Sequence, residues 1–180
     1  DISHDVQTFR DDWAKFYGNR LPLSWMLRTD ATVPWVRYHA LPGSKRYAEN
    51  DAEKAIILSR ANVIGNRLLG RASPCWQIET RMDEMADAGE LVGTFRESDD
   101  PDEPVWSIYV QAVEWRAGMF DSQLRAIADD KYWAFWMSRS NGAVFAPYDG
   151  GFDLFPCSVE QVSALKVEHP DWLSSHPEGL

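Results

Sequence analysis

The chain has few cysteines and few histidines. Its 180 residues include two cysteines, Cys75 and Cys157, and four histidines. Neither cysteine lies in a C-x-x-C or other metal-ligand spacing, so a disulfide scaffold and a histidine-based zinc site are disfavoured. We expect two reduced, largely buried thiols, with a disulfide between them only if the strands that they flank are neighbours.

Long hydrophobic runs are also missing. No segment approaches the roughly 18 apolar residues that a membrane-spanning helix needs. Residues 1–10 lack the basic region and apolar stretch of an export signal. We therefore expect a cytoplasmic protein with no membrane partner, while a first residue other than Met leaves upstream processing open.

Positive charge is scarce. Lys and Arg number 18 against 28 Asp and Glu, which gives a formal net charge of -10. A protein with this net negative charge repels the phosphate backbone of nucleic acids, so we expect no nucleic-acid partner. A basic protein, in contrast, would be attracted.

Common catalytic and cofactor motifs are absent as well. The sequence holds no G-x-S-x-G, H-E-x-x-H, P-loop or G-x-G-x-x-G pattern. We expect no cofactor and no bound metal. An enzymatic role is left uncertain and is the less favoured class.

Hydrophobic and aromatic residues are plentiful. Hydrophobic residues make up 44% of the chain, and nine of the residues are Trp. A chain of this length buries roughly 70% of the surface of its unfolded form, which is enough for one domain without staples. We therefore expect a single domain over 1–180 with an aromatic core.

Apolar spacing and caps predict several helices. Apolar residues three and four apart predict a helix over 5–17. A capping-box pattern predicts a long helix from Asn50 to a stop at Gly70, with Gly65 inside it marking close packing or a break. Two shorter helices are expected, over 120–128 and from Ser158 onward.

The remaining periodicity predicts strands over 33–39, 75–80, 90–96, 106–115, 132–137, 143–148 and 152–155. Pro34 restricts the first to a strand start or a sheet edge, and the long alternating 106–115 strand is expected to be central. Asn141-Gly142 and Asp149-Gly150-Gly151 mark turns that join the last three strands in a meander. The expected fold is α+β, a mainly antiparallel sheet whose C-terminal strand meander packs against three or four helices.

Basic side chains gather in one segment, 37–47, of this acidic chain. Arg37, Lys45 and Arg46 are candidate anion-binding residues for a phosphate or carboxylate, because guanidinium and ammonium groups donate charge-assisted hydrogen bonds to such groups. His39 is a candidate for proton transfer and shares strand parity with Arg37, so both are expected on one sheet face. In the simpler structural interpretation, these cations pair with carboxylates and His39 packs at the strand end.

Two carboxylates flank a glycine turn near the C-terminus. Asp149 and Asp153 lie four residues apart in Y-D-G-G-F-D, and convergent carboxylates can divide acid and base roles or hold a cation. They are the second set of candidate catalytic residues. The structural alternative is a turn-forming Asp149 and an Asp153 that is exposed or pairs with a nearby Arg.

An acidic segment separates the 90–96 and 106–115 strands. Residues 97–104 contain five carboxylates and two prolines without the spacing of an EF-hand, which predicts an exposed loop. Trp residues that are not needed in the core would mark a protein-binding surface. The candidate partner-binding residues are Asp99, Asp100, Asp102, Glu103, Trp106 and Trp133.

Three segments have an order and spacing that are moderately specific: R-Y-H-A-L-P-G-S-K-R-Y at 37–47, F-A-P-Y-D-G-G-F-D-L at 145–154 and W-L-S-S-H-P-E-G-L at 172–180. Together they resemble a family of small bacterial proteins known only as a domain of unknown function. The resemblance implies a bacterial cytosolic protein and carries no activity or catalytic residue. Relatives have aspartate and arginine after the Tyr-Asp pair where this chain has Gly150 and Gly151, which weakens a charge-dependent role for that turn.

Gly18 and Leu21-Pro22 after an aromatic helix resemble toxin-immunity proteins that neutralise secreted bacterial nucleases. Three hypotheses follow. The leading one is a non-enzymatic bacterial protein-binding module, such as an immunity protein that masks a basic toxin or nuclease. The second is an enzyme or binding protein for a small anion, built on the 37–47 segment, and the third is a homo-oligomer that buries spare aromatic residues.

Overall fold

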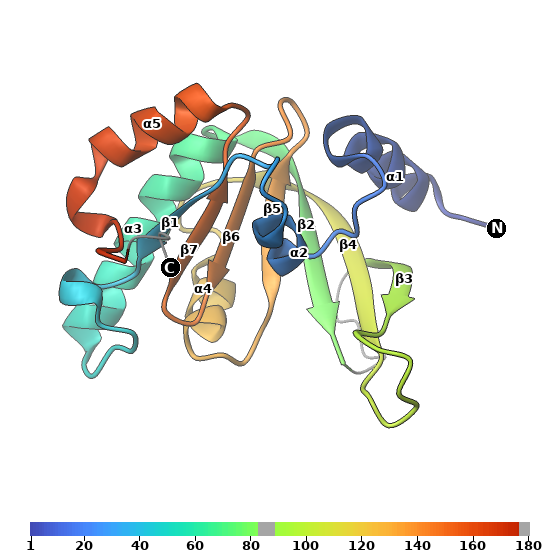
Figure 1. The fold of residues 1–180 in the computed structure, drawn as a ribbon, viewed down its shortest axis with the longest axis horizontal. Coiled ribbons are helices and arrows are strands. Elements are labelled where there is room, and N and C mark those ends of the chain that lie inside the picture. The colour runs from blue at the N-terminus through green and yellow to red at the C-terminus, as the bar shows by residue number, and fades with distance from the viewer. Residues whose placement is uncertain (83–88, 177–180) are drawn as a thin grey trace.

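The computed structural model describes residues 1–82 and 89–176, and within them an antiparallel seven-stranded sheet carries helices on both faces (Figure 1). The strands are β1 (Val36–His39), β2 (Ser73–Arg81), β3 (Glu90–Phe95), β4 (Trp106–Trp115), β5 (Ala134–Ser138), β6 (Val144–Tyr148) and β7 (Gly151–Phe155). The α-helices are α1 (His4–Tyr17), α2 (Ser24–Thr29), α3 (Asp51–Leu69), α4 (Asp121–Ala128) and α5 (Val159–Glu168). The predicted α+β class with a mainly antiparallel sheet is confirmed, with the six-residue α2 as an unpredicted helix.

The strand order is β1-β7-β6-β5-β2-β4-β3. The predicted meander is present, because β5, β6 and β7 pair in succession. The prediction that the 106–115 strand is central is wrong: β4 is next to last and β5 lies in the middle. Alternation of apolar and polar residues indicates which faces of a strand are buried, but it does not give the position of the strand in the sheet. Here β3 pairs with β4 and forms the edge of the sheet.

Each face of the sheet packs against its own hydrophobic core. Helices α3, α4 and α5 contribute to one core, which contains the fully buried rings of Trp115 and Trp136. Helix α1 and Leu27 of α2 contribute to the other, where Phe9 packs edge-on against Trp76 with 5.6 Å between ring centroids. Edge-to-face pairs add to the stabilisation from buried area. The aromatic core predicted from composition is therefore divided between two layers.

The two cysteines are both free, and Cys75 is buried whereas Cys157 is exposed. The expectation of two buried thiols is therefore wrong for Cys157, which follows β7 and lies outside both cores. The strands that the cysteines flank, β2 and β7, are separated in the sheet by β5 and β6. Burial raises the pKa of the Cys75 thiol to about 12, so this thiol is unreactive at neutral pH.

Helix α3 has the predicted caps. The Asn50 side chain accepts a hydrogen bond from the Glu53 backbone N–H at 2.9 Å, and Gly70, with φ of 92°, follows the last helical residue. Gly65 reflects close packing and not a break, because a Cβ atom at this position would overlap the indole ring of Trp115. The glycine thus lets α3 approach Trp115 of the sheet closely at this position.

Gly65→Ala is expected to lower the free energy of unfolding by about 1–3 kcal/mol through overpacking against Trp115. Without that obstacle, alanine would favour the helix by up to about 1 kcal/mol. Urea denaturation measures the difference, with Ser59→Ala on the exposed face of α3 as the control that should be neutral. A Gly65→Ala variant as stable as the parent would contradict the close packing.

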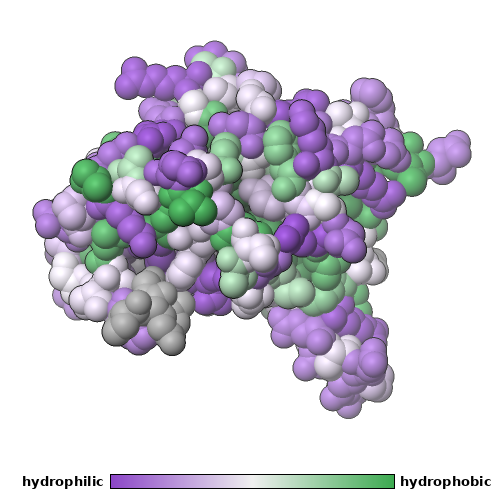
Figure 2. Space-filling model, turned by 45° about the horizontal axis from the view of Figure 1, so that its top comes forward, coloured by the Kyte–Doolittle hydropathy of each residue, from purple (hydrophilic) through white to green (hydrophobic). Residues whose placement is uncertain are grey.

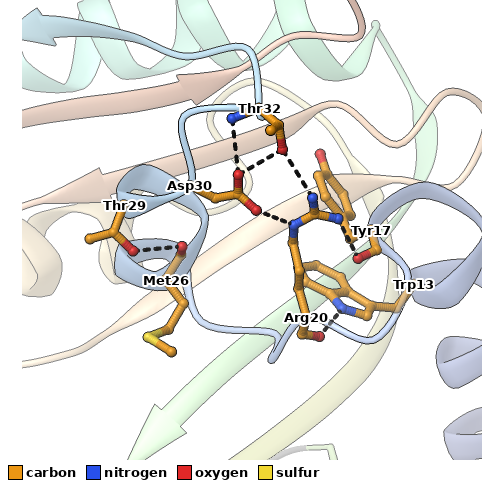
Figure 3. A network of polar contacts seen from close by, with 7 residues as sticks. All are labelled: Trp13, Tyr17, Arg20, Met26, Thr29, Asp30 and Thr32. Carbon is orange, nitrogen blue, oxygen red and sulfur yellow. Dashed lines mark hydrogen bonds and ion pairs between the residues drawn. The ribbon is translucent and has the colours of Figure 1, made fainter.

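A polar network ties the end of α1 to the segment after α2 (Figure 3). The Arg20 guanidinium contacts Asp30 Oδ2 at 2.7 Å and donates to the Tyr17 carbonyl at 2.9 Å. Asp30 Oδ1 accepts from both the backbone N–H and the hydroxyl of Thr32, and the Trp13 indole donates to the Arg20 carbonyl. Hydrogen bonds from Thr32 and Arg20 lower the pKa of Asp30 to about 2.

This network predicts a specific acid sensitivity. Asp30 ionises at a pH well below its ordinary pKa of 3.8, so the unfolded chain takes up its proton first as the pH falls. Asp30 therefore stabilises the fold above about pH 4, and this contribution is lost between about pH 4 and pH 2. Urea midpoints measured across that range should fall less steeply for Asp30→Asn than for the parent; equal slopes would show that Asp30 is not responsible.

Both edges of the sheet carry additional contacts. Tyr38 of β1 forms an isolated bridge with Leu173, which follows the 3-10 helix Pro170–Trp172. At the other edge, the register of β3 shifts between Leu91 and Gly93, and Arg10 donates a hydrogen bond to the Val92 carbonyl at 2.8 Å. Among the described residues, no helix is long and apolar enough to span a bilayer.

Candidate functional site

The two segments singled out for chemistry lie side by side. Strand β1 pairs with β7, and the antiparallel register places Arg37 opposite Asp153 and His39 opposite Gly151. Val36 and Tyr38 enter the core that α3 covers, so Arg37 and His39 point to the other face, as their parity predicts. The basic and acidic candidates are thus brought together at the β1 edge of the sheet.

Arg37 and Asp153 form a bidentate ion pair. Their nitrogen–oxygen distances are 2.7 Å and 3.0 Å, and the side chains are only 13% and 9% exposed. The Trp35 indole also donates to Asp153 at 2.9 Å, and the guanidinium lies 4.5 Å from the centroid of the Tyr148 ring. Burial alone would lower the pKa of Arg37, but the hydrogen bonds and charge of Asp153 outweigh it, and the pKa is raised.

The other two cations of the segment are also paired. Arg46 contacts Asp149 at 3.1 Å, and the Tyr47 hydroxyl donates to the same carboxylate at 2.7 Å. Burial opposes ionisation of Asp149, but hydrogen bonds from Tyr47 and Arg46 outweigh it and lower its pKa. Lys45 contacts Glu49 at 3.0 Å and Glu53 at 2.8 Å. Each cation that was a candidate anion ligand therefore has a carboxylate beside it.

The side chain of His39 favours its neutral form more than that of an ordinary histidine does. Partial burial and the nearby charges of Arg37 and Arg60 lower its pKa. Arg60 also donates to the His39 backbone carbonyl at 2.9 Å and stacks over Trp172 at 4.7 Å. These contacts hold the end of β1 in place. The arrangement favours the structural interpretation of His39 over a role in proton transfer.

The acidic segment forms an exposed arm between β3 and β4. We call residues 97–104 the acidic arm; it extends from one end of the sheet (Figure 1), and Figure 2 shows a largely hydrophilic projection there. Asp99, Asp100 and Asp102 are exposed and Glu103 is half-buried. Asp100 also shapes the turn, because its carboxylate accepts from the Asp102 backbone N–H at 2.9 Å.

Three tryptophans line up beside the acidic arm. Trp106, the first residue of β4, packs edge-on between Trp25 and Trp133, with ring centroids 6.2 Å and 6.0 Å apart. Trp25 and Trp106 are half-buried and Trp133 is 37% exposed. The Trp133 indole donates to Asp130 at 2.9 Å. We call Trp25, Trp106 and Trp133 the tryptophan row; it places partly accessible aromatic surface where the arm joins the body.

A polar cavity was not predicted from the sequence. It has a volume of about 630 Å³ and lies between the β2–β4 part of the sheet, α4 and the segment before β5. Gln77, Glu79 and Arg81 line it from alternate positions of β2. Polar residues at positions i, i+2 and i+4 of a strand that is otherwise buried are the signal that could have revealed it.

Metal binding finds no support in the described parts of the chain. Residues 1–82 and 89–176 contain no group of three His, Cys, Asp or Glu side chains that could hold an ion. Asp149 and Asp153 are each engaged by an arginine instead.

A protein-family comparison covers most of the chain. The model of a domain of unknown function, DUF3885, matches residues 23–177. The chain belongs to the DUF3885 family. The matched region extends from just before α2 through all seven described strands to the segment after the last 3-10 helix, so it includes the β1–β7 pair, the acidic arm and the polar cavity. No curated protein and no solved structure matches the chain.

Proposed function

We propose that this chain is a non-enzymatic protein-binding module that binds a basic protein through the acidic arm and the tryptophan row. The observation that carries the proposal is the position of the arm, which presents carboxylates on a projection directly beside partly accessible indole rings. Charge attracts and orients a basic partner, and aromatic side chains supply the short-range affinity.

The distribution of ion pairs supports this choice over a small-anion site. Arg37, Lys45 and Arg46 are each matched by carboxylates, so the 37–47 segment offers little net positive charge to a phosphate. Among the described residues, no Lys or Arg forms an ion pair with a carboxylate of the acidic arm. The acidic arm therefore presents carboxylates whose charge no described Lys or Arg neutralises.

We infer that the basic partner is a toxin of the nuclease class. A nuclease must attract a phosphate backbone, so the surface around its active site carries Lys and Arg. An acidic arm can cover such a surface and compete with nucleic acid for it. In this proposal the chain is a bacterial immunity protein, in keeping with its overall charge of -10.

Site-specific cross-linking in cells tests the proposal. A photoreactive residue in place of Ser98, on the arm, should capture a basic protein that the same residue in place of Ser163, exposed on α5, does not. Association of that protein with the purified chain should slow as salt is added. Capture from both positions alike, or a captured partner whose association rate is independent of salt, would overturn the proposal.

A further inference from the structure

The polar cavity lies apart from the 37–47 segment. Its floor is formed by β2 and by Gln111 of β4, its wall by Ser122 and Gln123 of α4, and its rim by Trp133. A volume of about 630 Å³ is typical of small-molecule sites, which occupy roughly 300–1,000 Å³. The cavity is therefore large enough for an organic ligand of one or two rings.

The floor of the cavity holds polar groups where a core would favour apolar ones. Gln77 and Glu79 are only 7% and 6% exposed, on the strand face that begins with the buried Cys75 in the hydrophobic core. Burial of an amide or a carboxylate lowers stability unless hydrogen bonds compensate. Partners in the cavity lining compensate for this cost, so both polar groups are retained beside an open cavity where a ligand can approach them.

These groups are held in fixed positions. Gln77 donates to the Tyr132 hydroxyl at 3.0 Å, and Arg81 contacts Glu79 at 3.1 Å. Burial and the adjacent Glu79 carboxylate raise the pKa of Tyr132, so its hydroxyl keeps its proton. A ligand would therefore meet a preorganised set of donors and acceptors and would cause little rearrangement.

The lining also indicates the chemistry of the ligand. Gln77, Gln111 and Gln123 each carry a donor and an acceptor, which suits the hydroxyl groups of a sugar. Glu79 pairs with Arg81 in the floor, so the floor does not demand a charged ligand; Lys131, which also lines the cavity, is exposed to solvent. Trp133 at the rim adds aromatic surface for the C–H face of a ring.

We propose that this cavity binds a small, uncharged, polyhydroxylated molecule, a neutral monosaccharide or cyclic polyol. The cavity lies apart from the acidic arm but shares Trp133 with the tryptophan row, so its ligand and the proposed protein partner would contact the same side chain. Its ligand would add a small-molecule signal to a protein-binding module.

Titrations of the ¹⁵N-labelled chain with D-glucose, D-galactose, N-acetyl-D-glucosamine and myo-inositol test this inference. At least one of these probes should give saturable shifts in the Gln77, Gln111 and Trp133 side-chain resonances. Gln111→Ala should weaken that probe about fivefold, as expected for one lost hydrogen bond. Gln7→Ala on the exposed face of α1 is the matched control and should leave binding unchanged.

A second variant keeps the test decisive. Ser122→Trp places a bulky ring in the cavity from an exposed position of α4, so it should abolish binding while the rest of the spectrum stays native. Absence of saturable shifts with all four probes would overturn the inference. So would equal binding by Ser122→Trp, or saturable binding of D-glucuronate alone, which would show that the site requires an anion.

Discussion

Replacement of Asp99, Asp100 and Asp102 by asparagine is expected to slow association with the basic partner about tenfold at low ionic strength. The three carboxylates lie on the acidic arm, where they are exposed to solvent. Asparagine keeps the side-chain oxygen with which Asp100 accepts from the Asp102 backbone N–H, so the turn should persist. Stopped-flow measurements at low and high salt give the rates, and the parent and variant should converge at high salt as screening shortens the Debye length.

A charge-matched control separates local steering from net charge. Asp51→Asn, Glu160→Gln and Asp171→Asn also remove three negative charges, from exposed positions on or next to α3 and α5. These helices lie at the opposite end of the molecule from the arm (Figure 1). This triple variant should associate nearly as fast as the parent. Equal slowing by both triple variants would mean that the arm has no special role.

Asp153→Ala is expected to lower the free energy of unfolding by about 3–5 kcal/mol, because it leaves the buried Arg37 guanidinium without its counter-charge. The effect should be large because Asp153 satisfies two groups at once, the guanidinium and the Trp35 indole N–H. Chemical denaturation followed by tryptophan fluorescence measures the loss. The same substitution tests whether the Arg37–Asp153 ion pair stabilises the fold, as the structural interpretation of these residues requires.

An exposed ion pair provides the control. Arg67 also contacts Glu168 through three short nitrogen–oxygen distances, but these side chains are 42% and 36% exposed. Glu168→Ala should therefore cost at most about 1 kcal/mol. The double variant Arg37→Met/Asp153→Leu should recover much of the stability lost in Asp153→Ala, since no unpaired charge remains. A loss in Asp153→Ala no greater than that in Glu168→Ala would contradict this account.

Local signals predicted most elements of the fold. The 106–115 alternation matches β4 from end to end, and the capping pattern places α3 within one residue. These features depend on neighbouring residues, so the sequence records them directly. Helix α2 was missed because it has six residues and no side-chain cap, and so few residues give no usable period.

Features that depend on which strands pair were harder to predict from the sequence. The place of β4 beside an edge strand and the exposure of Cys157 follow from which strands pair, and periodicity does not encode pairing. Pairing of Asp153 with an arginine was one of two alternatives, but the sequence did not identify Arg37, because the β1–β7 register that brings the two together is a tertiary feature. The polar cavity was missed because its lining comes from β2, β4, α4 and the segment before β5, and no single stretch shows it.

The contacts at the two sheet edges determine how this protein can meet another chain. Leu173 bridges Tyr38 at one edge, and at the other the irregular register of β3 and the Arg10 contact interrupt the regular row of backbone groups. Irregular or covered edges discourage the addition of a foreign strand, which is the usual route to sheet-to-sheet aggregation. We therefore expect a partner to recognise side chains and not to add a strand, and we expect the protein to remain dispersed at concentrations at which an open-edged sheet would polymerise.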